Sequence, residues 1–311
     1  MPKKIVQVIG EFVRIRWRSR DTPEGEVPFL IGEMRSDEFG RVGFKCNADP
    51  AEFIPCQVYR FQGYAENHPK FGKTIDVRSW TVEEPHSRRG LTIYLQRNCE
   101  GIGAKRASDL WDAFGVKAVE VCRTDPSKAH GALGGIVPLE VMKSNARKLE
   151  SIKETEHVRI ELVDLLSGRG FRQVAIDQCI AKWKLNAPDA IKANPYILMQ
   201  QGIAGAGFLR CDGLYLELGH DPAAMVRQIY ALHYALKSDT GGNSWIHWIQ
   251  CRTMLNSMIS SVDVDGREAL KSAVDLGLVV YRKETDGLWV SEKKRADNER
   301  VLCASIRGML V

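Results

Sequence analysis

The chain has 311 residues, of which 44% are hydrophobic and 27% charged, a composition typical of globular proteins and not of disordered or fibrous ones. Its length corresponds to about two or three domains. Its apolar runs fall far short of the ~20 residues that a membrane span needs, and the N-terminus lacks the pattern of a secretion signal. The net charge of +5 permits an anionic partner but does not require one.

The cysteines and histidines give no sign of a metal site. The eight cysteines stand singly, without a CxxC pair, and the seven histidines show neither HExxH nor His-x-His spacing. We therefore expect no metal and no cofactor. Single cysteines among apolar neighbours, such as Cys122, Cys179 and Cys303, are typical of small core residues in a reduced, cytoplasmic protein.

Residues 1–85 are expected to form a small β-barrel. Five short segments rich in β-forming residues are separated by clusters of glycine, aspartate and proline; they span 5–13, 27–34, 41–45, 57–64 and 74–81. Short strands at this spacing, without helical periodicity, predict a closed barrel. The OB type is the preferred prediction.

Residues 86–220 are expected to form an all-α bundle, because apolar residues recur there at helical spacing. The predicted helices include 138–149, 157–166, 171–183, 195–199 and 208–218. Asn194 and Asp221 each precede a proline, which is the signature of an N-cap followed by proline at the first helical position.

Residues 221–311 are expected to form a winged-helix-like segment with a final linker helix. The pattern is helical as far as residue 260 and again over 266–276. The Asp263-x-Asp265 pair before this second helix is expected to be its N-terminal cap, and Gly277 is the expected stop. Strands at 278–282 and 288–290 flank a turn. The whole chain is therefore predicted to be an α+β multidomain protein.

Three segments share one local pattern, in which a helix runs into Gly-x-Gly and a second helix begins at once. Hairpin 1 contains Gly101, Ile102, Gly103, Lys105 and Arg106; hairpin 2 contains Gly168, Arg169, Gly170 and Arg172; hairpin 3 contains Gly205, Gly207 and Arg210. A small or β-branched residue follows four positions after each second glycine, at Ala107, Val174 and Cys211. We expect the two helices of each hairpin to cross there.

This pattern is typical of a helix-hairpin-helix, whose physics favours phosphate binding. Glycine permits a positive φ and lets a ligand approach the main chain. The first amides of the second helix have no intrahelical partner and point outward at the positive end of the helix dipole. The basic residues just downstream would pair with neighbouring DNA phosphates. Such contacts hold the DNA backbone and do not read the bases. For any one copy, a tight turn between two helices remains an equal alternative.

A second candidate site for nucleic-acid binding, also basic, lies on the first predicted strand. Strict alternation would place Arg14, Arg16 and Arg18 on one face and Ile15 and Trp17 on the other. A basic strand face on an OB-like barrel suits a nucleic-acid backbone, with aromatic residues available to stack on bases. An ordinary solvated strand face is the alternative.

The sequence argues against catalysis by this chain. Phe71-Gly72-Lys73-Thr74 ends like a P-loop, but GxxxxGK[ST] requires glycine at position 67, which is Asn67. The segment also lies between two predicted strands. We find neither a nucleophile–base pair nor the carboxylate cluster with which nucleases hold two metals.

Several motifs together resemble a known family. They are 63–72 (GYAENHPKFG), the first hairpin with Tyr94-Leu95 before it and Phe114-Gly115 after it, and the block that combines Asn194-Pro195-Tyr196 with 203–208 (IAGAGF) and Asp212. Their order and spacing over roughly residues 55–290 are similar to the N-terminal region of RecD-like DNA helicases of superfamily 1B.

The resemblance implies an OB-like barrel, a helix-hairpin-helix array and a winged-helix-like segment that engage single-stranded or forked DNA through its phosphates. In that family the region precedes an ATP-driven 5′→3′ motor, and this chain ends near where the motor would begin. Two positions depart from the family: Ala206 replaces an isoleucine, and Gly242-Asn243-Ser244 stands where Gly-His-Thr/Ser is frequent.

The predicted function is sequence-independent, non-catalytic DNA binding. The alternative is a protein-interaction scaffold that docks a helicase motor or a single-strand-binding protein. A third hypothesis, a subunit of a structure-specific nuclease, would require metal-dependent cleavage of forked DNA.

Overall fold

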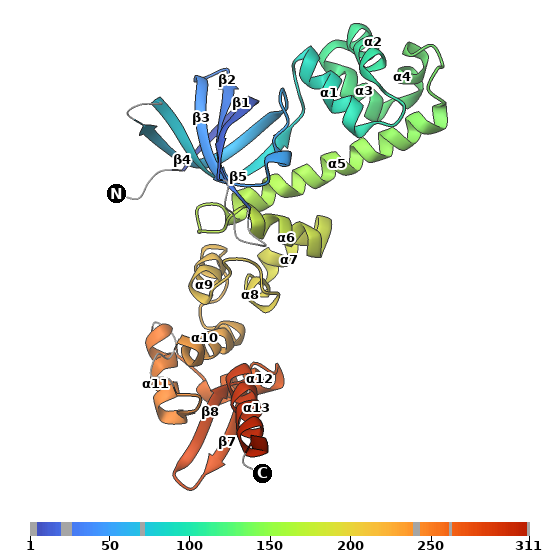
Figure 1. Cartoon of the computed structure of the whole chain (residues 1–311). Helices are drawn as coiled ribbons and strands as arrows, with labels where there is room; N and C mark the ends of the chain where they lie inside the picture. Colours follow the sequence, from blue (N-terminus) through green and yellow to red (C-terminus); the bar gives the residue numbers. More distant parts are fainter. Residues whose placement is uncertain (1–4, 20–26, 69–71, 239–242, 261–262, 310–311) are drawn as a thin grey trace. The chain divides into compact units, whose positions relative to one another are not determined.

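The structure is a computed structural model that describes residues 5–19, 27–68, 72–238, 243–260 and 263–309. The chain divides into two compact units (Figure 1): unit 1 comprises Met1–Asp189 and Ile203–Gly205, and unit 2 comprises Ala190–Gly202 and Ala206–Val311. Among the described residues, no helix has the length and apolar character needed to cross a membrane.

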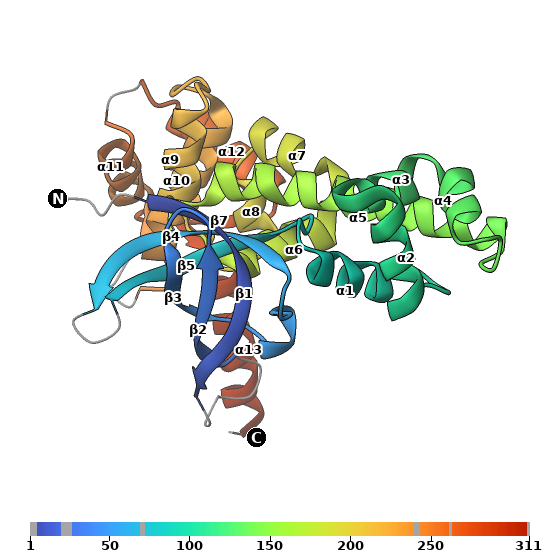
Figure 2. The same ribbon diagram turned by 90° about the horizontal axis from the view of Figure 1, so that it is seen from above.

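Unit 1 begins with a closed five-stranded barrel, as the sequence predicts. Its strands are β1 (Ile5–Arg18), β2 (Phe29–Ser36), β3 (Gly40–Asn47), β4 (Val58–His68) and β5 (Gly72–Glu83), in the order β1-β2-β3-β5-β4. The β3–β5 pair is parallel, and the other pairs are antiparallel. The curved strands (Figure 2) enclose an aromatic core in which the Phe44 and Phe61 ring centroids lie 4.8 Å apart. Gly72, Lys73 and Thr74, which resemble the end of a P-loop, belong to β5.

Two bulges in β1 overturn the expected alternation of side chains. The register with β2 shifts between Phe12 and Arg14 and again between Ile15 and Trp17. Each extra residue reverses the faces of the residues that follow it. Trp17 therefore lies on the outer face with Arg14, and it is 52% exposed.

The helices of unit 1 follow the barrel. They are α1 (Arg88–Asn98), α2 (Ala104–Phe114), α3 (Ala118–Thr124), α4 (Pro126–Ala132), α5 (Leu139–Leu166) and α6 (Gln173–Trp183); α7 (Ala187–Ala193) spans the boundary with unit 2. The two helices predicted at 138–149 and 157–166 are one continuous helix of 28 residues, α5. Three short helices, α3, α4 and α7, were missed because each offers too few turns for an apolar period to show.

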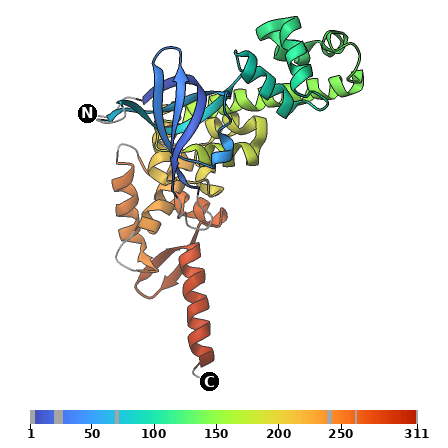
Figure 3. The ribbon, with the colours of Figure 1, turned by 45° about the horizontal axis from the view of Figure 1, so that its top comes forward.

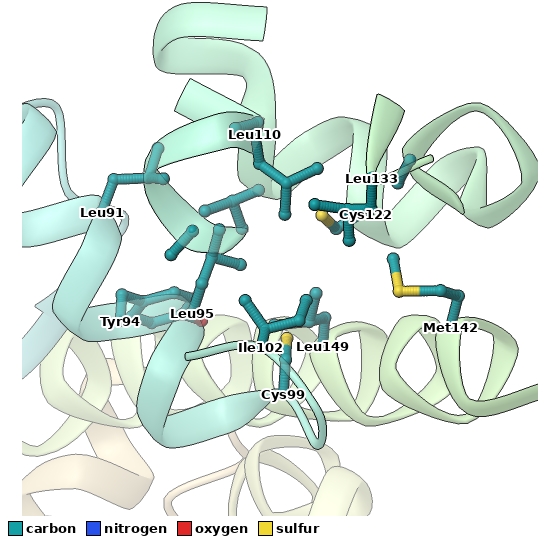
Figure 4. Close-up of a cluster of buried hydrophobic side chains, with 14 of the residues drawn as sticks. Leu91, Tyr94, Leu95, Cys99, Ile102, Leu110, Cys122, Leu133, Met142 and Leu149 are labelled. Atoms are coloured by element: carbon teal, nitrogen blue, oxygen red, sulfur yellow. The ribbon is translucent and has the colours of Figure 1, made fainter. Parts of the chain in front are cut away.

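Helix α5 connects the two parts of unit 1. The short helices α1 to α4 pack against its N-terminal half, and its C-terminal half reaches β5 (Figures 1 and 2). Leu91, Leu95, Leu110, Met142 and Leu149 from three helices form one buried cluster (Figure 4). This cluster fixes hairpin 1 on α5.

Unit 2 contains a winged-helix-like segment. Its elements are α8 (Ile197–Gln200), α9 (Phe208–Glu217), α10 (Met225–Ser238), β6 (Ile246–His247), α11 (Trp248–Met258), α12 (Gly266–Asp275), β7 (Val279–Glu284), β8 (Gly287–Glu292) and α13 (Lys293–Met309). The strands form a sheet in the order β6-β8-β7. The stretch predicted as helical up to residue 260 is therefore interrupted by β6, a strand of two residues.

Some of the helix-capping residues predicted in unit 2 make the expected hydrogen bonds, and one does not. Asp265 accepts a hydrogen bond from the Glu268 amide at the start of α12, and Gly277 at its end has a φ of +67°. Asn194 accepts one from the Tyr196 amide at 3.1 Å. Asp221 instead forms a turn before α10, which begins three residues later than a proline at its first position would require.

A buried polar network explains two of the motif residues. The Tyr196 hydroxyl donates to Asp212 at 2.6 Å, and Arg227 donates to the same carboxylate at 2.8 and 3.0 Å. Burial, reinforced by the bond to Asp212, raises the pKa of Tyr196. The bond to Asp212 raises the pKa of Arg227. The network joins α9 to α10 and to the segment that precedes α8.

Seven of the eight cysteines are buried and all are free thiols, which confirms most of the expected core role. Burial raises the pKa of six of them to about 12: Cys46, Cys99, Cys122, Cys179, Cys211 and Cys251. Cys303 is the exception. It is exposed on α13, the red helix at the C-terminal end of the ribbon in Figure 3, and it follows Val301 and Leu302, which are 63% and 60% exposed.

Candidate nucleic-acid interface

Hairpin 1, the turn at 99–103 between α1 and α2, exposes the start of α2. Gly101 has a φ of +73°, which favours glycine. Gly103 is the N-cap of α2 and makes no side-chain cap bond. A Cβ built on Gly103 meets no heavy atom within 4 Å. The first amides of α2 are therefore accessible to a ligand.

Hairpin 1 has one buried apolar side chain, Ile102, and two basic side chains at the surface, Lys105 and Arg106. Ile102 is 3% exposed and points into the buried cluster beside Leu149 (Figure 4). Lys105 is exposed, and Arg106 is half-buried and donates to the Gly101 carbonyl at 2.6 Å. Ala107 is fully buried, as predicted for the crossing of two helices. Ile102 can therefore offer a ligand only its main chain.

The side chain of Asn145 in α5 makes two hydrogen bonds to the main chain of hairpin 1. Its side-chain Oδ1 accepts from the Glu100 amide at 2.8 Å, and its Nδ2 donates to the Glu100 carbonyl at 2.9 Å. Asn145 is 3% exposed, so both bonds lie away from solvent. The sequence reasoning missed this residue, although an asparagine between the apolar positions Met142 and Leu149 was a visible signal.

Replacing Asn145 with alanine is expected to lower the free energy of unfolding by about 1–3 kcal/mol, because two hydrogen bonds to the Glu100 main chain are lost. The same variant should also weaken DNA binding, since hairpin 1 loses its support. Chemical denaturation measures the first effect and fluorescence anisotropy the second. Asn145→Asp is the matched control: it keeps the acceptor for the Glu100 amide but not the donor. A variant as stable as the wild type would contradict this role of Asn145.

Three other helices of the chain have the side-chain N-cap that is absent at the start of α2. Ser87, Asp125 and Asp265 each accept a bond from an amide in the first turn of α1, α4 and α12. Such a cap occupies an amide that an anion would otherwise use. The N-caps of α2, α6 and α9, which follow the three hairpins, make no side-chain cap bond.

Hairpin 2, the turn at 167–172 between α5 and α6, has a different register from the predicted one. Gly168 and Gly170 both have positive φ, but the N-cap of α6 is Arg172. Gly170, the buried Phe171 and Arg172 therefore correspond to Gly101, Ile102 and Gly103 of hairpin 1.

This shift corrects the expected crossing residue of hairpin 2. Val174 is 46% exposed, whereas Ala175 and Ile176 are each 1% exposed and lie where the helices meet. The side chain of Arg169 folds back onto α5 and donates to the Leu165 carbonyl at 2.6 Å. Arg172 is exposed.

Hairpin 2 docks against the barrel. The Trp80 amide donates to the Gln173 side chain at 3.0 Å, and the Val82 amide donates to Glu156 at 3.2 Å. The pairing of β5 with β3 covers only Thr74–Asp76 of β5. Further along β5, the Trp80 and Val82 amides find their hydrogen-bond acceptors on α6 and α5 instead. Burial raises the pKa of Glu156, although Arg159 opposes this effect.

Hairpin 3, the turn at 201–207 between α8 and α9, resembles hairpin 1 in its main chain. Gly205 has a φ of +76° and Gly207 is the N-cap of α9. A Cβ on Gly207 meets no heavy atom within 4 Å. Arg210 is exposed, and Cys211 is fully buried at the predicted crossing.

The basic residues of the barrel face surround a carboxylate. Arg14 and Arg16 lie 3.3 and 3.1 Å from Glu33, whose side chain is 2% exposed. Burial alone would raise the pKa of Glu33, but its bonds to Arg16 and Arg14 hold it below the ordinary value. Arg41 also approaches this carboxylate, at 3.7 Å. Three guanidinium groups around one carboxylate leave this face positive.

Some motif positions lie outside the described residues. These are residues 69–71 of the 63–72 segment and Gly242. The described residues include no group of three or more histidine, cysteine, aspartate or glutamate side chains able to hold a metal ion.

A comparison with family models assigns the centre of the chain. Residues 154–245 match the model described as the HHH domain of the ATP-dependent RecD2 DNA helicase. The match begins within α5 and covers hairpins 2 and 3. The closed barrel that precedes it is the element that the RecD-like resemblance implies. The chain thus carries a helix-hairpin-helix domain of the RecD2 type and is similar to the N-terminal region of RecD2-like DNA helicases.

Proposed function

We propose that this chain is a sequence-independent DNA-binding region of a RecD2-like helicase and does not itself catalyse a reaction. It holds DNA by its phosphates at the hairpin turns. Hairpin 1 is the main contact, with hairpin 2 next. The substrate is single-stranded or forked DNA.

The observation that carries this proposal is the open start of α2. Its first amides have no side-chain cap, Gly103 places no side chain in front of them, and Lys105 is exposed in the first turn of α2. In the described residues Lys105 has no ion-pair partner. An oxyanion is the ligand that such a helix start favours.

Binding to labelled oligonucleotides tests the proposal. We expect similar affinities for two unrelated sequences of equal length, because phosphate contacts carry no sequence information. Fluorescence anisotropy with single-stranded, duplex and forked probes at low salt gives both the affinity and the preferred form. Absence of binding to all three probes would contradict the proposal.

A second candidate function, docking of a protein partner, has one observation in its favour. Val301, Leu302 and Ile306 of α13 are between 48% and 63% exposed and lie in a stretch, residues 301–307, in which every residue is exposed. A helicase motor or a single-strand-binding protein is the proposed partner. Polar substitution of the three residues should abolish docking without changing DNA affinity.

A further inference from the structure

A groove in unit 1 lies between the outer face of the barrel and hairpin 2. It has a volume of about 620 Å³, and β2, β3, β5 and the start of α6 contribute its walls. It brings the outer face of three barrel strands together with a helix-hairpin-helix turn.

Three cations line this groove, against one carboxylate. Lys45, Arg78 and Arg172 contribute positive charge, and Asp76 is the one acid among the lining residues. The Arg172 side chain is exposed and has no hydrogen-bond or ion-pair partner among the described residues. The groove therefore has the charge that a phosphate backbone requires.

Two of these cations are held by carboxylates in this structure. Lys45 lies 2.6 Å from Glu66, and Arg78 lies 2.7 Å from Asp76. These pairs fix both side chains at the groove wall. The Arg78 Nε is nevertheless buried without a hydrogen-bond partner.

Aromatic side chains extend the groove along the barrel. Phe29 lines it, and Trp17 packs edge-to-face on Phe29 with ring centroids 6.3 Å apart. Trp17 also lines a neighbouring cavity of about 1040 Å³ with Arg16. Trp17 is exposed and Phe29 is half-buried. Aromatic rings beside a positively charged groove are typical of surfaces that bind unstacked bases and their phosphates.

We propose that this groove binds single-stranded DNA, with bases on Trp17 and Phe29 and phosphates at Lys45, Arg78 and Arg172. The inference rests on the proposed function and gives it a second, separate contact. Duplex DNA does not use the groove, because its bases are stacked inside the helix and cannot reach the two rings. Hairpin 1 remains the contact for duplex.

Charge reversal at Arg172 tests the phosphate end. We expect Arg172→Glu to weaken binding of a single-stranded oligo(dT) probe about tenfold at low salt and to lower its salt slope by about 0.7, the loss of one contact. Duplex affinity should fall by a smaller factor, because hairpin 1 is the main contact for duplex and hairpin 2 only the second. Lys182→Glu is the matched control, since Lys182 is exposed near the other end of the same helix.

Cross-linking tests the aromatic end in the wild-type chain. A single-stranded probe with 5-iododeoxyuridine should cross-link to the peptide that contains Trp17, and Trp17→Ala should abolish this product and weaken binding on the order of tenfold. Cross-links confined to other peptides would overturn the inference. So would an Arg172→Glu variant that binds oligo(dT) as tightly as Lys182→Glu.

The two proposals fail in different ways. Suppose that Lys105→Glu abolishes duplex binding while Arg172→Glu leaves oligo(dT) binding unchanged. This result would overturn the inference that the groove binds single-stranded DNA, and the proposed function would stand. A wild-type chain that binds no DNA at all would overturn both.

Discussion

Replacing Asp212 with alanine is expected to lower the free energy of unfolding by about 3–5 kcal/mol. The Asp212 carboxylate accepts three hydrogen bonds, one from Tyr196 and two from Arg227. The Arg227 side chain is 6% exposed. Alanine would leave this guanidinium buried without its counter-charge. Urea denaturation followed by tryptophan fluorescence measures the effect.

Two further variants separate the charge from the packing. Tyr196→Phe removes one hydrogen bond and should cost only about 1 kcal/mol. The double variant Asp212→Leu with Arg227→Met removes both charges and should recover part of the lost stability, because the buried guanidinium is gone. An Asp212→Ala variant that loses less than about 1 kcal/mol would contradict the role of the network.

Reversing both charges at hairpin 1, Lys105→Glu with Arg106→Glu, is expected to weaken duplex binding about a hundredfold at low salt. Each charge-assisted hydrogen bond to a phosphate contributes about 1.5 kcal/mol or more, and two such losses correspond to this factor. The added carboxylates also repel the DNA. Anisotropy with a labelled duplex gives the change directly.

Lys117→Glu is the control for this variant, because Lys117 is exposed on the short helical turn just after α2. Arg106 donates to the Gly101 carbonyl, so its reversal also removes a bond within the turn. Lys105→Glu alone leaves that bond intact and should still weaken binding about tenfold. Equal affinities for the wild type and the double variant would exclude hairpin 1 as a DNA contact.

Local sequence chemistry predicted much of the fold. The glycine and proline clusters separated the five barrel strands, and Asp265 and Gly277 marked the two ends of α12. Gly101 marked hairpin 1 because its positive φ favours glycine, and Gly103 marked the start of α2, where it is the N-cap. These features depend on neighbours in the chain, which a sequence displays.

The errors arose where distant residues decide the outcome. The bulges in β1 follow from its pairing with β2, so the face of Trp17 was not visible locally. In hairpin 2 both Gly168 and Gly170 can take a positive φ, and only the burial of Phe171 sets the register. The groove at Arg172 likewise exists because β5 takes its hydrogen bonds from Gln173 and Glu156.

The salt dependence of duplex binding tests the phosphate-gripping account most directly. For the wild type, the logarithm of the association constant should fall linearly with the logarithm of salt concentration, by about 0.9 per phosphate contact. The Lys105→Glu, Arg106→Glu variant should show a slope smaller by about 1.8, the loss of two contacts. A flat response of the wild type, or the same slope for both proteins, would contradict the account.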